Sequence, residues 1–168
     1  LWMLGTSAFP LYLYQGDNNH GHTIFEGSIS AMGPVLDQQL QNLGVANDQV
    51  RQVVVTHAHP DHVMAVPVFQ RMFPHMTTIA SKLAAQTLQI EKAVAFFGKL
   101  DGALTKWLAE RKLIDEQEQQ LFDQKDPAKG PIKVDRIVGE GDRIDVGLDR
   151  AFTVLETPGH SDCSLSFY

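Results

Sequence analysis

The 168-residue sequence contains one cysteine, Cys163. A single cysteine cannot close an internal disulfide, so the sequence excludes a disulfide-stapled scaffold and does not indicate a redox compartment. It also lacks any apolar run near the roughly 20 residues that a membrane-spanning helix needs. The apolar start at residues 1–4 has neither the basic region nor the long apolar stretch of a signal peptide. We therefore expect a cytoplasmic protein with no membrane partner, although a leader removed before residue 1 would leave the same sequence.

Excess positive charge is also absent. The chain has 14 Lys and Arg against 20 Asp and Glu, a formal net charge of −6. Such a balance provides no broad basic surface for nucleic acid, and it favours a small-molecule substrate that does not depend on a positively charged entrance. No internal repeat or low-complexity tract is present, and 43% of the residues are hydrophobic. Length and composition together predict a single domain over residues 1–168.

A dense group of metal-binding side chains follows an apolar run. Residues 53–56 read Val-Val-Val-Thr, which is typical of a buried strand, and the next six are His57-Ala58-His59-Pro60-Asp61-His62. Imidazole and carboxylate together suit zinc, or another first-row ion such as iron or manganese. The alternative is a polar loop in which Asp61 is the N-cap of a helix that runs to about Met72. That alternative does not account for three histidines.

A fourth histidine follows another short strand-like run. Residues 152–155 read Phe-Thr-Val-Leu, and Glu156-Thr157-Pro158-Gly159-His160 comes next. Pro and Gly favour a turn there, so His160 is expected at the end of a strand, as His57 is. If the two strands lie side by side, His160 completes a three-histidine set with His57 and His59.

These two motifs resemble those of a known family. The stretches T-H-A-H-P-D-H at 56–62 and T-P-G-H-S-D at 157–162 are similar to the metal motifs of the metallo-β-lactamase superfamily. The resemblance covers most of residues 9–75 and 130–168. It implies an α/β fold, the αβ/βα sandwich of that superfamily, with a hydrolytic site for one or two metal ions, zinc above all and iron or manganese as alternatives.

The resemblance also implies roles for individual residues. His57, His59 and His160 would hold the first ion, while Asp61 and His62 would belong to the second. Asp61 would in addition orient the water between the two ions and act as the catalytic carboxylate. A metal-bound water can have its pKa lowered to about 7, which supplies hydroxide at neutral pH.

Several positions depart from the pattern that the resemblance leads us to expect. Members of the superfamily usually supply a bridging Asp and a last His after the Pro-Gly-His turn, whereas this chain stops at Tyr168. We therefore expect only the N-terminal half of the sandwich, a domain incomplete at its C-terminus. Glu26 stands where a strand-ending Asp is common and either supports the metal loop or is a solvated acid. Met64 either narrows the site or, as we favour, packs beneath it. Cys163 is either a soft ligand or, as we favour, a buried apolar thiol.

The middle of the chain carries a helical insertion at about 81–126. Ser81 is the expected N-cap, Gly98 and Gly102 are expected to bend or break the helix, and a shorter charged helix is expected from Arg111 to Gln124. Two apolar stripes at helical spacing cover one broad face. The first consists of Leu83, Ile90, Val94, Phe97, Leu104 and Leu108, and the second of Phe96, Leu100, Ala103 and Trp107.

Three interpretations of this insertion remain open. It covers the site as a lid whose Phe96, Phe97 and Trp107, together with Met64, wall a substrate pocket. It forms the interface of a homo-oligomer. Or it packs against the sandwich in the ordinary way.

Two classes of function follow from the sequence. The first is an enzyme, a metal-dependent hydrolase that uses a metal-bound hydroxide on a small ester, thioester, lactone or amide; an iron-dependent oxidoreductase of the same superfamily is a minority form of it. The second is a non-catalytic or incomplete metal-binding module that lacks the second half of the site.

Overall fold

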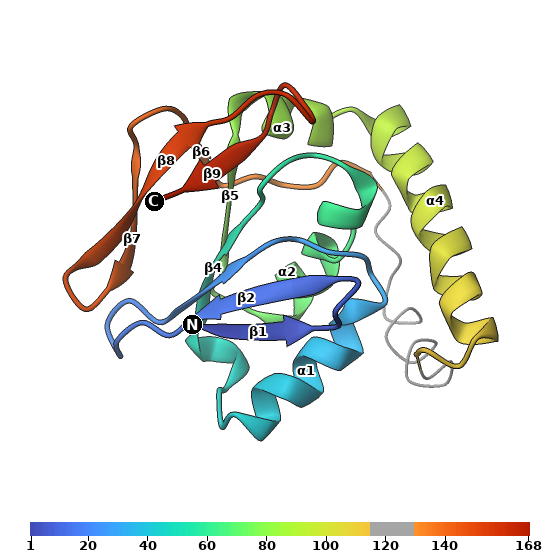
Figure 1. Cartoon of the computed structure of the whole chain (residues 1–168), viewed down its shortest axis with the longest axis horizontal. Coiled ribbons are helices and arrows are strands. Elements are labelled where there is room, and N and C mark those ends of the chain that lie inside the picture. The colour runs from blue at the N-terminus through green and yellow to red at the C-terminus, as the bar shows by residue number, and fades with distance from the viewer. Residues whose placement is uncertain (115–129) are drawn as a thin grey trace.

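A computed structural model describes residues 1–114 and 130–168 of the chain (Figure 1). Among the residues in these two ranges, no helix is both long and apolar enough to cross a membrane. The elements in chain order are β1 (Trp2–Gly5), β2 (Pro10–Tyr14), β3 (His22–Phe25), α1 (Met32–Asn42), η1 (Asn47–Gln49), β4 (Val50–Val54), η2 (Pro60–His62), α2 (Val66–Met72), β5 (Thr77–Ser81), α3 (Lys82–Leu88), α4 (Glu91–Glu110), β6 (Arg136–Val138), β7 (Arg143–Gly147), β8 (Arg150–Glu156) and β9 (Leu165–Phe167).

The centre of the fold is a six-stranded mixed sheet in the order β1-β2-β3-β4-β5-β6. The pairs β1–β2 and β2–β3 are antiparallel, whereas β3–β4, β4–β5 and β5–β6 are parallel. Phe25, Val54 and Ile79 are neighbours across the parallel strands. Because parallel strands end at the same edge of a sheet, the loops that follow β3, β4 and β5 lie together, and such edges commonly carry ligand sites.

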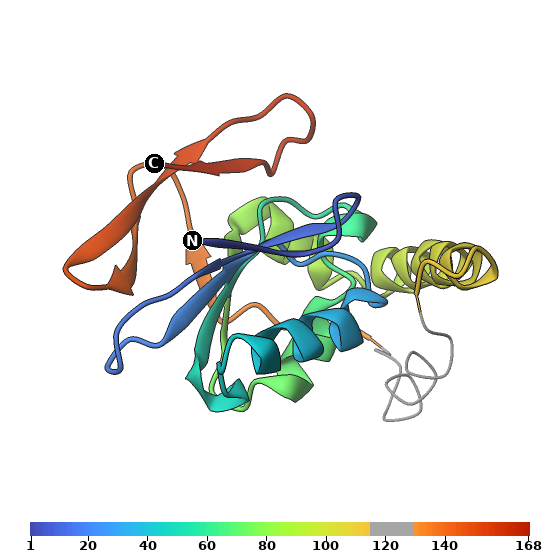
Figure 2. The ribbon, with the colours of Figure 1, turned by 60° about the horizontal axis from the view of Figure 1, so that its bottom comes forward.

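Each face of this sheet is covered by a different layer (Figure 2). On one face the apolar sides of α1 and α2 pack on the sheet through residues such as Leu36, Leu40 and Phe69. On the other face the antiparallel sheet β7-β8-β9 covers Phe25 and Val54. Burial from both sides explains why apolar residues follow one another without alternation towards the carboxyl ends of these strands, as in Ile24-Phe25, Val53-Val54 and Ile79-Ala80.

Hydrogen bonds join the two sheets at both ends. At one end the amide of Leu148 donates to Oδ2 of Asp17 at 2.8 Å. At the other end the amide of Leu165 donates to the carbonyl of Thr56 at 2.9 Å. The second contact places the loop between β8 and β9 beside the loop that follows β4.

The strand and helix around the histidine motif differ from the prediction. The predicted strand at 53–56 is β4, which begins earlier, at Val50, and ends at Val54 because its ladder with β3 stops there. The predicted helix to Met72 begins only at Val66, after the short 3₁₀ turn η2. Asp61 lies inside η2 and is not an N-cap, since Ala65 is the residue that precedes α2.

The described part of the insertion contains two helices. Ser81 is the N-cap of α3, as predicted, and its hydroxyl accepts a hydrogen bond from the amide of Ala84. Gly98 and Gly102 were expected to bend or break the next helix, and the break is wrong: α4 is continuous through both, because a helix tolerates an isolated glycine at a cost of about 1 kcal/mol. The helix predicted at 111–124 is not present over residues 111–114, which form a turn, and its remainder lies outside the described residues.

The residues of the two apolar stripes have different environments. In the first stripe Val94 and Leu108 of α4 are buried in the main core and Phe97 is partly buried against it, whereas Leu83 of α3 and Ile90 before α4 are exposed. Phe96 and Trp107 of the second stripe are 57% and 45% exposed. Fewer apolar side chains of the helix are therefore buried in the core than the sequence pattern predicts.

Gly102 provides a test of the helix assignment. It lies inside α4 on an exposed face, and a Cβ built on it meets nothing within 4 Å. Gly102→Ala should therefore raise the free energy of unfolding by about 0.5–1 kcal/mol, because alanine loses less backbone entropy in a helix. Thermal or denaturant unfolding of the variant measures this, and an unchanged or lower stability would contradict a continuous helix at this position.

Candidate metal centre

Three of the predicted ligands lie together at the edge of the sheet. His57 and His59 come from the loop after β4, and His160 comes from the loop between β8 and β9. One ring nitrogen of each histidine lies within 4.8 Å of the other two. His57 is buried, His59 is half-buried and His160 is exposed, so the group opens to solvent on the side of His160.

The ring of His57 is oriented by Thr56, which in turn contacts Glu26. Its Nδ1 lies 3.0 Å from Oγ1 of Thr56, and the Thr56 hydroxyl donates to Oε2 of Glu26 at 2.9 Å. Since the hydroxyl proton points to Glu26, the Thr56 oxygen accepts from Nδ1–H, and Nε2 of His57 carries the free lone pair. That Nε2 is buried and has no hydrogen-bond partner among the residues that the structure describes. A buried acceptor without a partner is unfavourable unless another group binds it.

His59 and His160 face each other at the open side. Nδ1 of His59 lies 3.0 Å from Nε2 of His160. The loop that carries His160 is held by Cys163, whose Sγ accepts from the amide of Ala58 at 3.3 Å and whose carbonyl accepts from Oγ of Ser81 at 3.0 Å. Cys163 is half-buried and is not among the three grouped ligands. It joins the two ligand loops.

The other two predicted ligands make contacts of their own. Nδ1 of His62 lies 2.8 Å from Oε2 of Glu26, and Nε2 of His62 lies 3.4 Å from Oδ2 of Asp61. The side chain of Asp61 is 53% exposed, whereas that of Glu26 is 13% exposed. The structure therefore places His62 between two carboxylates, with its ring centroid 4.1 Å from that of His57. It does not include His62 or Asp61 in the three-histidine group.

Of the two alternatives predicted for Glu26, a support of the metal loop and a solvated acid, the contacts agree with the first. Its carboxylate contacts both Thr56 and His62, and its own backbone has a positive φ of 93°. The next residue, Gly27, approaches η2 so closely that a Cβ there would overlap the carbonyl oxygen of His62.

The role of Thr56 was missed in the sequence, although a hydroxyl next to a predicted ligand is the kind of group that orients imidazole rings.

The four predicted pocket residues have different environments. Met64 is buried in the core, where its Cε lies 3.9 Å from the position that a Cβ on Gly98 would take. A place for Met64 beneath the metal site stays a prediction. Phe97 is half-buried against the core, and Phe96 and Trp107 face solvent on α4. A substrate pocket walled by these residues stays a prediction.

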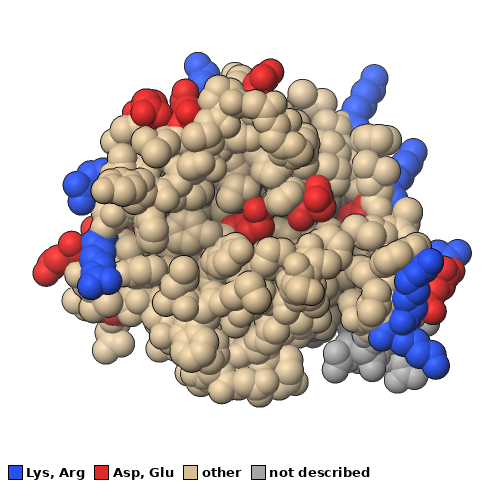
Figure 3. Space-filling view, in the orientation of Figure 1, with Lys and Arg blue, Asp and Glu red and all other residues tan. Residues whose placement is uncertain are grey.

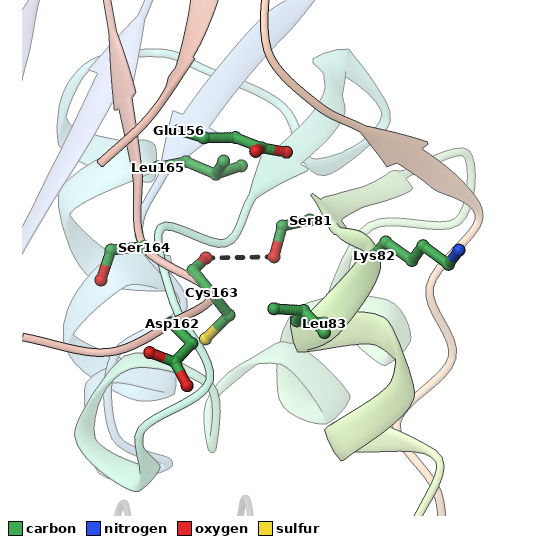
Figure 4. A pocket seen from close by; sticks show the side chains of 8 residues that line it. All are labelled: Ser81, Lys82, Leu83, Glu156, Asp162, Cys163, Ser164 and Leu165. Carbon is green, nitrogen blue, oxygen red and sulfur yellow. Dashed lines mark hydrogen bonds between the residues drawn. The ribbon is translucent and has the colours of Figure 1, made fainter. Parts of the chain in front are cut away.

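A small cavity of about 60 Å³ lies beside the ligand loops (Figure 4). Its walls come from the start of α3 and from the end of the β8–β9 connection. Cys163 and Asp162 lie on one side of it and Leu83 on the other (Figure 4). Cys163 therefore contacts both this cavity and, through the hydrogen bond from Ala58, the histidine motif.

The histidine group fits a metal ion. Two ligand nitrogens of one tetrahedral zinc ion lie about 3.3 Å apart, given bonds of about 2.0–2.1 Å, and the His59 and His160 nitrogens are 3.0 Å apart. The buried Nε2 of His57 gains a partner when an ion binds. Three imidazoles with an open fourth position suit zinc and iron alike, so the donor set does not choose between them.

Electrostatic interactions keep His57 neutral, which is the protonation state that can bind a metal ion. Burial, the positive charge of a protonated His62 and the neighbouring histidines lower the pKa of His57 to about 4, although Glu26 acts in the opposite direction. For His62, burial lowers the pKa, but the contact with Glu26 and the charge of Asp61 outweigh it and raise the pKa above 6.5. Neutral imidazole is the form that binds metals.

The chain belongs to the metallo-β-lactamase superfamily. The family model with that description matches residues 11–168, which is nearly the whole chain and includes both ligand motifs. Membership in this superfamily and the histidine group described above both indicate a site that could hold a metal ion.

Solved structures of metallo-β-lactamases share the fold. The native FEZ-1 enzyme from Legionella gormanii has a TM-score of 0.70 at 16% identity, and the match covers 98% of this chain and 53% of that protein. MIM-1 from Novosphingobium pentaromativorans has a TM-score of 0.69 at 23% identity, with 99% and 51% covered. A metallo-β-lactamase with a HARLDQ motif from Cronobacter sakazakii has a TM-score of 0.69 at 19% identity, with 99% and 53% covered. The predicted metallo-β-lactamase-like α/β fold is confirmed, and the chain spans about half the length of these proteins.

The contact between Glu26 and His62 can be tested by NMR of the metal-free protein. Glu26→Gln removes the negative charge beside His62, so the pKa of His62 should fall below its wild-type value. Loss of the charged partner should also lower the free energy of unfolding near pH 6 by about 1 kcal/mol. Glu110→Gln, which alters only an exposed contact with Lys106, is the control. An unchanged His62 pKa in Glu26→Gln would exclude the contact.

The low pKa of His57 predicts an acid-sensitive fold in the absence of metal. The unfolded chain takes up this proton near pH 6.5 and the folded protein only near pH 4, so between these values the unfolded state binds more protons. The stability contributed by a neutral His57 is therefore lost as the pH falls through this window. Denaturant unfolding of wild type and His57→Gln from about pH 7 to about pH 4 measures it. The stability difference between the two proteins should change across the window, and a constant difference would contradict the burial of a neutral His57.

Proposed function

We propose that this chain carries the first metal site of a metal-dependent hydrolase that acts on a small ester, thioester, lactone or amide. The observation that supports the proposal most directly is the buried Nε2 of His57, which has no hydrogen-bond partner within residues 1–114 and 130–168 and lies in a group with His59 and His160. A bound divalent ion supplies Lewis acidity and a water of lowered pKa, as hydrolysis at neutral pH requires.

The residues of the chain have separate roles in this proposal. His57, His59 and His160 hold the ion, and zinc is the expected metal, with iron or manganese as alternatives. Asp61, exposed beside the histidine group, accepts a proton from water and orients it. Glu26 holds His62 and, through Thr56, His57, so that the rings keep one orientation. Where a second ion binds, Asp61 and His62 are the residues that hold it.

The surface charge supports an uncharged substrate. On the face shown in Figure 3, Asp and Glu appear in the central hollow, whereas Lys and Arg lie mainly along the margins. With a net charge of −6, the protein offers little attraction to a polyanion. We therefore infer a small neutral substrate and no nucleic-acid partner.

A second candidate function is a metal-binding half-site that needs further residues for catalysis. It is favoured by two observations: the chain spans about half the length of similar metallo-β-lactamases, and His62 is engaged by Glu26 and Asp61 rather than grouped with the other three histidines. An iron-dependent oxidoreductase remains the minority alternative. A cytoplasmic location and a homo-oligomer formed through the helical insertion also stay predictions.

Metal content is the first test of the proposal. The purified chain should contain at least one equivalent of zinc, iron or manganese, and His59→Ala should lose most of it while remaining folded, because an ion held by three ligands loses a third of its protein bonds. His75→Ala is the matched control, since His75 is exposed and lies outside the group. Equal metal content in the wild type and in His59→Ala would overturn the site.

Activity then separates the two candidates. A metal-loaded chain that cleaves neutral chromogenic esters, lactones or amides, and whose activity disappears in His59→Ala, supports the hydrolase. A chain that binds one equivalent of metal without turning over any of these substrates supports the half-site.

A further inference from the structure

Helix α4 carries a buried carboxylate that points into the fold. Asp101 lies in the middle of α4 and is only 7% exposed. Its Oδ1 accepts a hydrogen bond from the amide of Ser30 at 2.9 Å, and its Oδ2 accepts a short one from the Ser30 hydroxyl. One residue therefore receives two hydrogen bonds from a single partner that lies 71 positions earlier in the chain.

Ser30 belongs to the loop that follows β3 and begins with Glu26. This loop lies against the ligand loop, because the amide of Ala65 donates to the carbonyls of both Gly27 and Ser28 at 3.1 Å. Glu26 and Ser28 have positive φ values of 93° and 45°, which are unfavourable for residues with a Cβ. A loop with this backbone keeps its shape only when its surroundings hold it.

The loop is held on two sides. On one side η2 and Ala65 contact it, and on the other side Asp101 holds Ser30. Helix α4 also contacts η2 directly, and Gly98 of α4 lies over Met64. The insertion is thus attached both to the ligand loop and to the loop that supplies Glu26.

We propose that Asp101 is a positioning residue for the metal centre, acting through Ser30 and Glu26. This inference rests on the proposed metal site. The contacts run from Asp101 to Ser30, along the loop to Glu26, and from the Glu26 carboxylate to Thr56 and His62. Thr56 then orients His57. The helical insertion therefore contributes to the ligand geometry without supplying a ligand.

The expected effect is a loss of metal affinity. Without Asp101, the amide and hydroxyl of Ser30 lose their acceptor, and the strained loop is free to relax towards ordinary backbone conformations. Glu26 then no longer holds Thr56 and His62 in place. Groups that orient metal ligands typically change affinity by 10- to 100-fold, and we expect about 10-fold for a residue one contact further away.

The experiment compares variants of the full chain by cobalt titration. Co²⁺ is the probe because its visible spectrum reports the geometry of its ligands. Asp101→Ala should weaken Co²⁺ binding about 10-fold and change the spectrum, whereas Asp101→Asn, which still accepts from the Ser30 amide, should restore most of the affinity. Ser30→Ala, which removes only the hydroxyl, should have an intermediate effect and serves as the second variant where Asp101→Ala does not fold.

A matched control separates positioning from general loosening of α4. Leu108→Ala also removes a buried side chain of the same helix, about two turns beyond Asp101, at a cost of about 2–5 kcal/mol in stability, but it leaves the carboxylate that holds Ser30 in place. It should leave the cobalt affinity and spectrum unchanged. Equal weakening in Leu108→Ala and Asp101→Ala would overturn the proposal, as would wild-type affinity and spectrum in a folded Asp101→Ala.

An NMR measurement on the metal-free protein tests the role of Asp101 separately from metal binding. In the metal-free wild type, the Nδ1 proton of His57 is held by Thr56 and should give a protected NMR signal. Asp101→Ala should lose that signal and Leu108→Ala should keep it. Should the wild type bind no metal, the proposed function fails, and the NMR comparison still decides whether Asp101 positions His57.

Discussion

The carboxylate of Glu26 is the contact on which the geometry of the metal centre depends. It lies at the end of β3 and reaches both Thr56 and His62 on the neighbouring ligand loop. Through the Thr56 hydroxyl it also determines which nitrogen of His57 is free. A half-buried negative charge is stabilised by hydrogen-bond partners, and the partners of Glu26 are the groups that orient the histidine rings. Placing this carboxylate requires the unusual backbone of residues 26–28, which the surrounding elements hold in place.

The arrangement of the strands explains why ligands distant in sequence meet. Parallel pairing of β3, β4 and β5 places their carboxyl ends at one edge, so Glu26 and the His57 loop are neighbours. His160 arrives from the other sheet, and the hydrogen bond between Leu165 and Thr56 joins that sheet to the same edge. The apolar contacts between the sheets, which include Phe25 with Phe152 and Phe167, supply the burial that keeps the two layers together.

Local patterns in the sequence predicted those parts of the site that depend on neighbouring residues. The His57-Ala58-His59 spacing, the strand before it and the turn that ends in His160 were visible because each is a short-range feature. The Ser81 cap was visible for the same reason. The boundaries of β4 and α2 were not, since they depend on where neighbouring strands stop pairing and on the turn at Pro60. The exposed side of α4 was misjudged because helical spacing alone does not show which apolar stripe has a partner.

By itself the sequence determined the composition of the ligand set, its place after two strands, the mixed α/β class and the helical nature of the insertion. Only the tertiary structure decided which groups meet: that His62 lies between Glu26 and Asp61, that Thr56 leaves Nε2 of His57 free, and that Asp101 holds Ser30. The physical reason is that hydrogen bonds and ion pairs act over about 3 Å, whereas these partners are separated by up to 71 positions along the chain. Their distances are set by sheet register and helix docking, which no local pattern records.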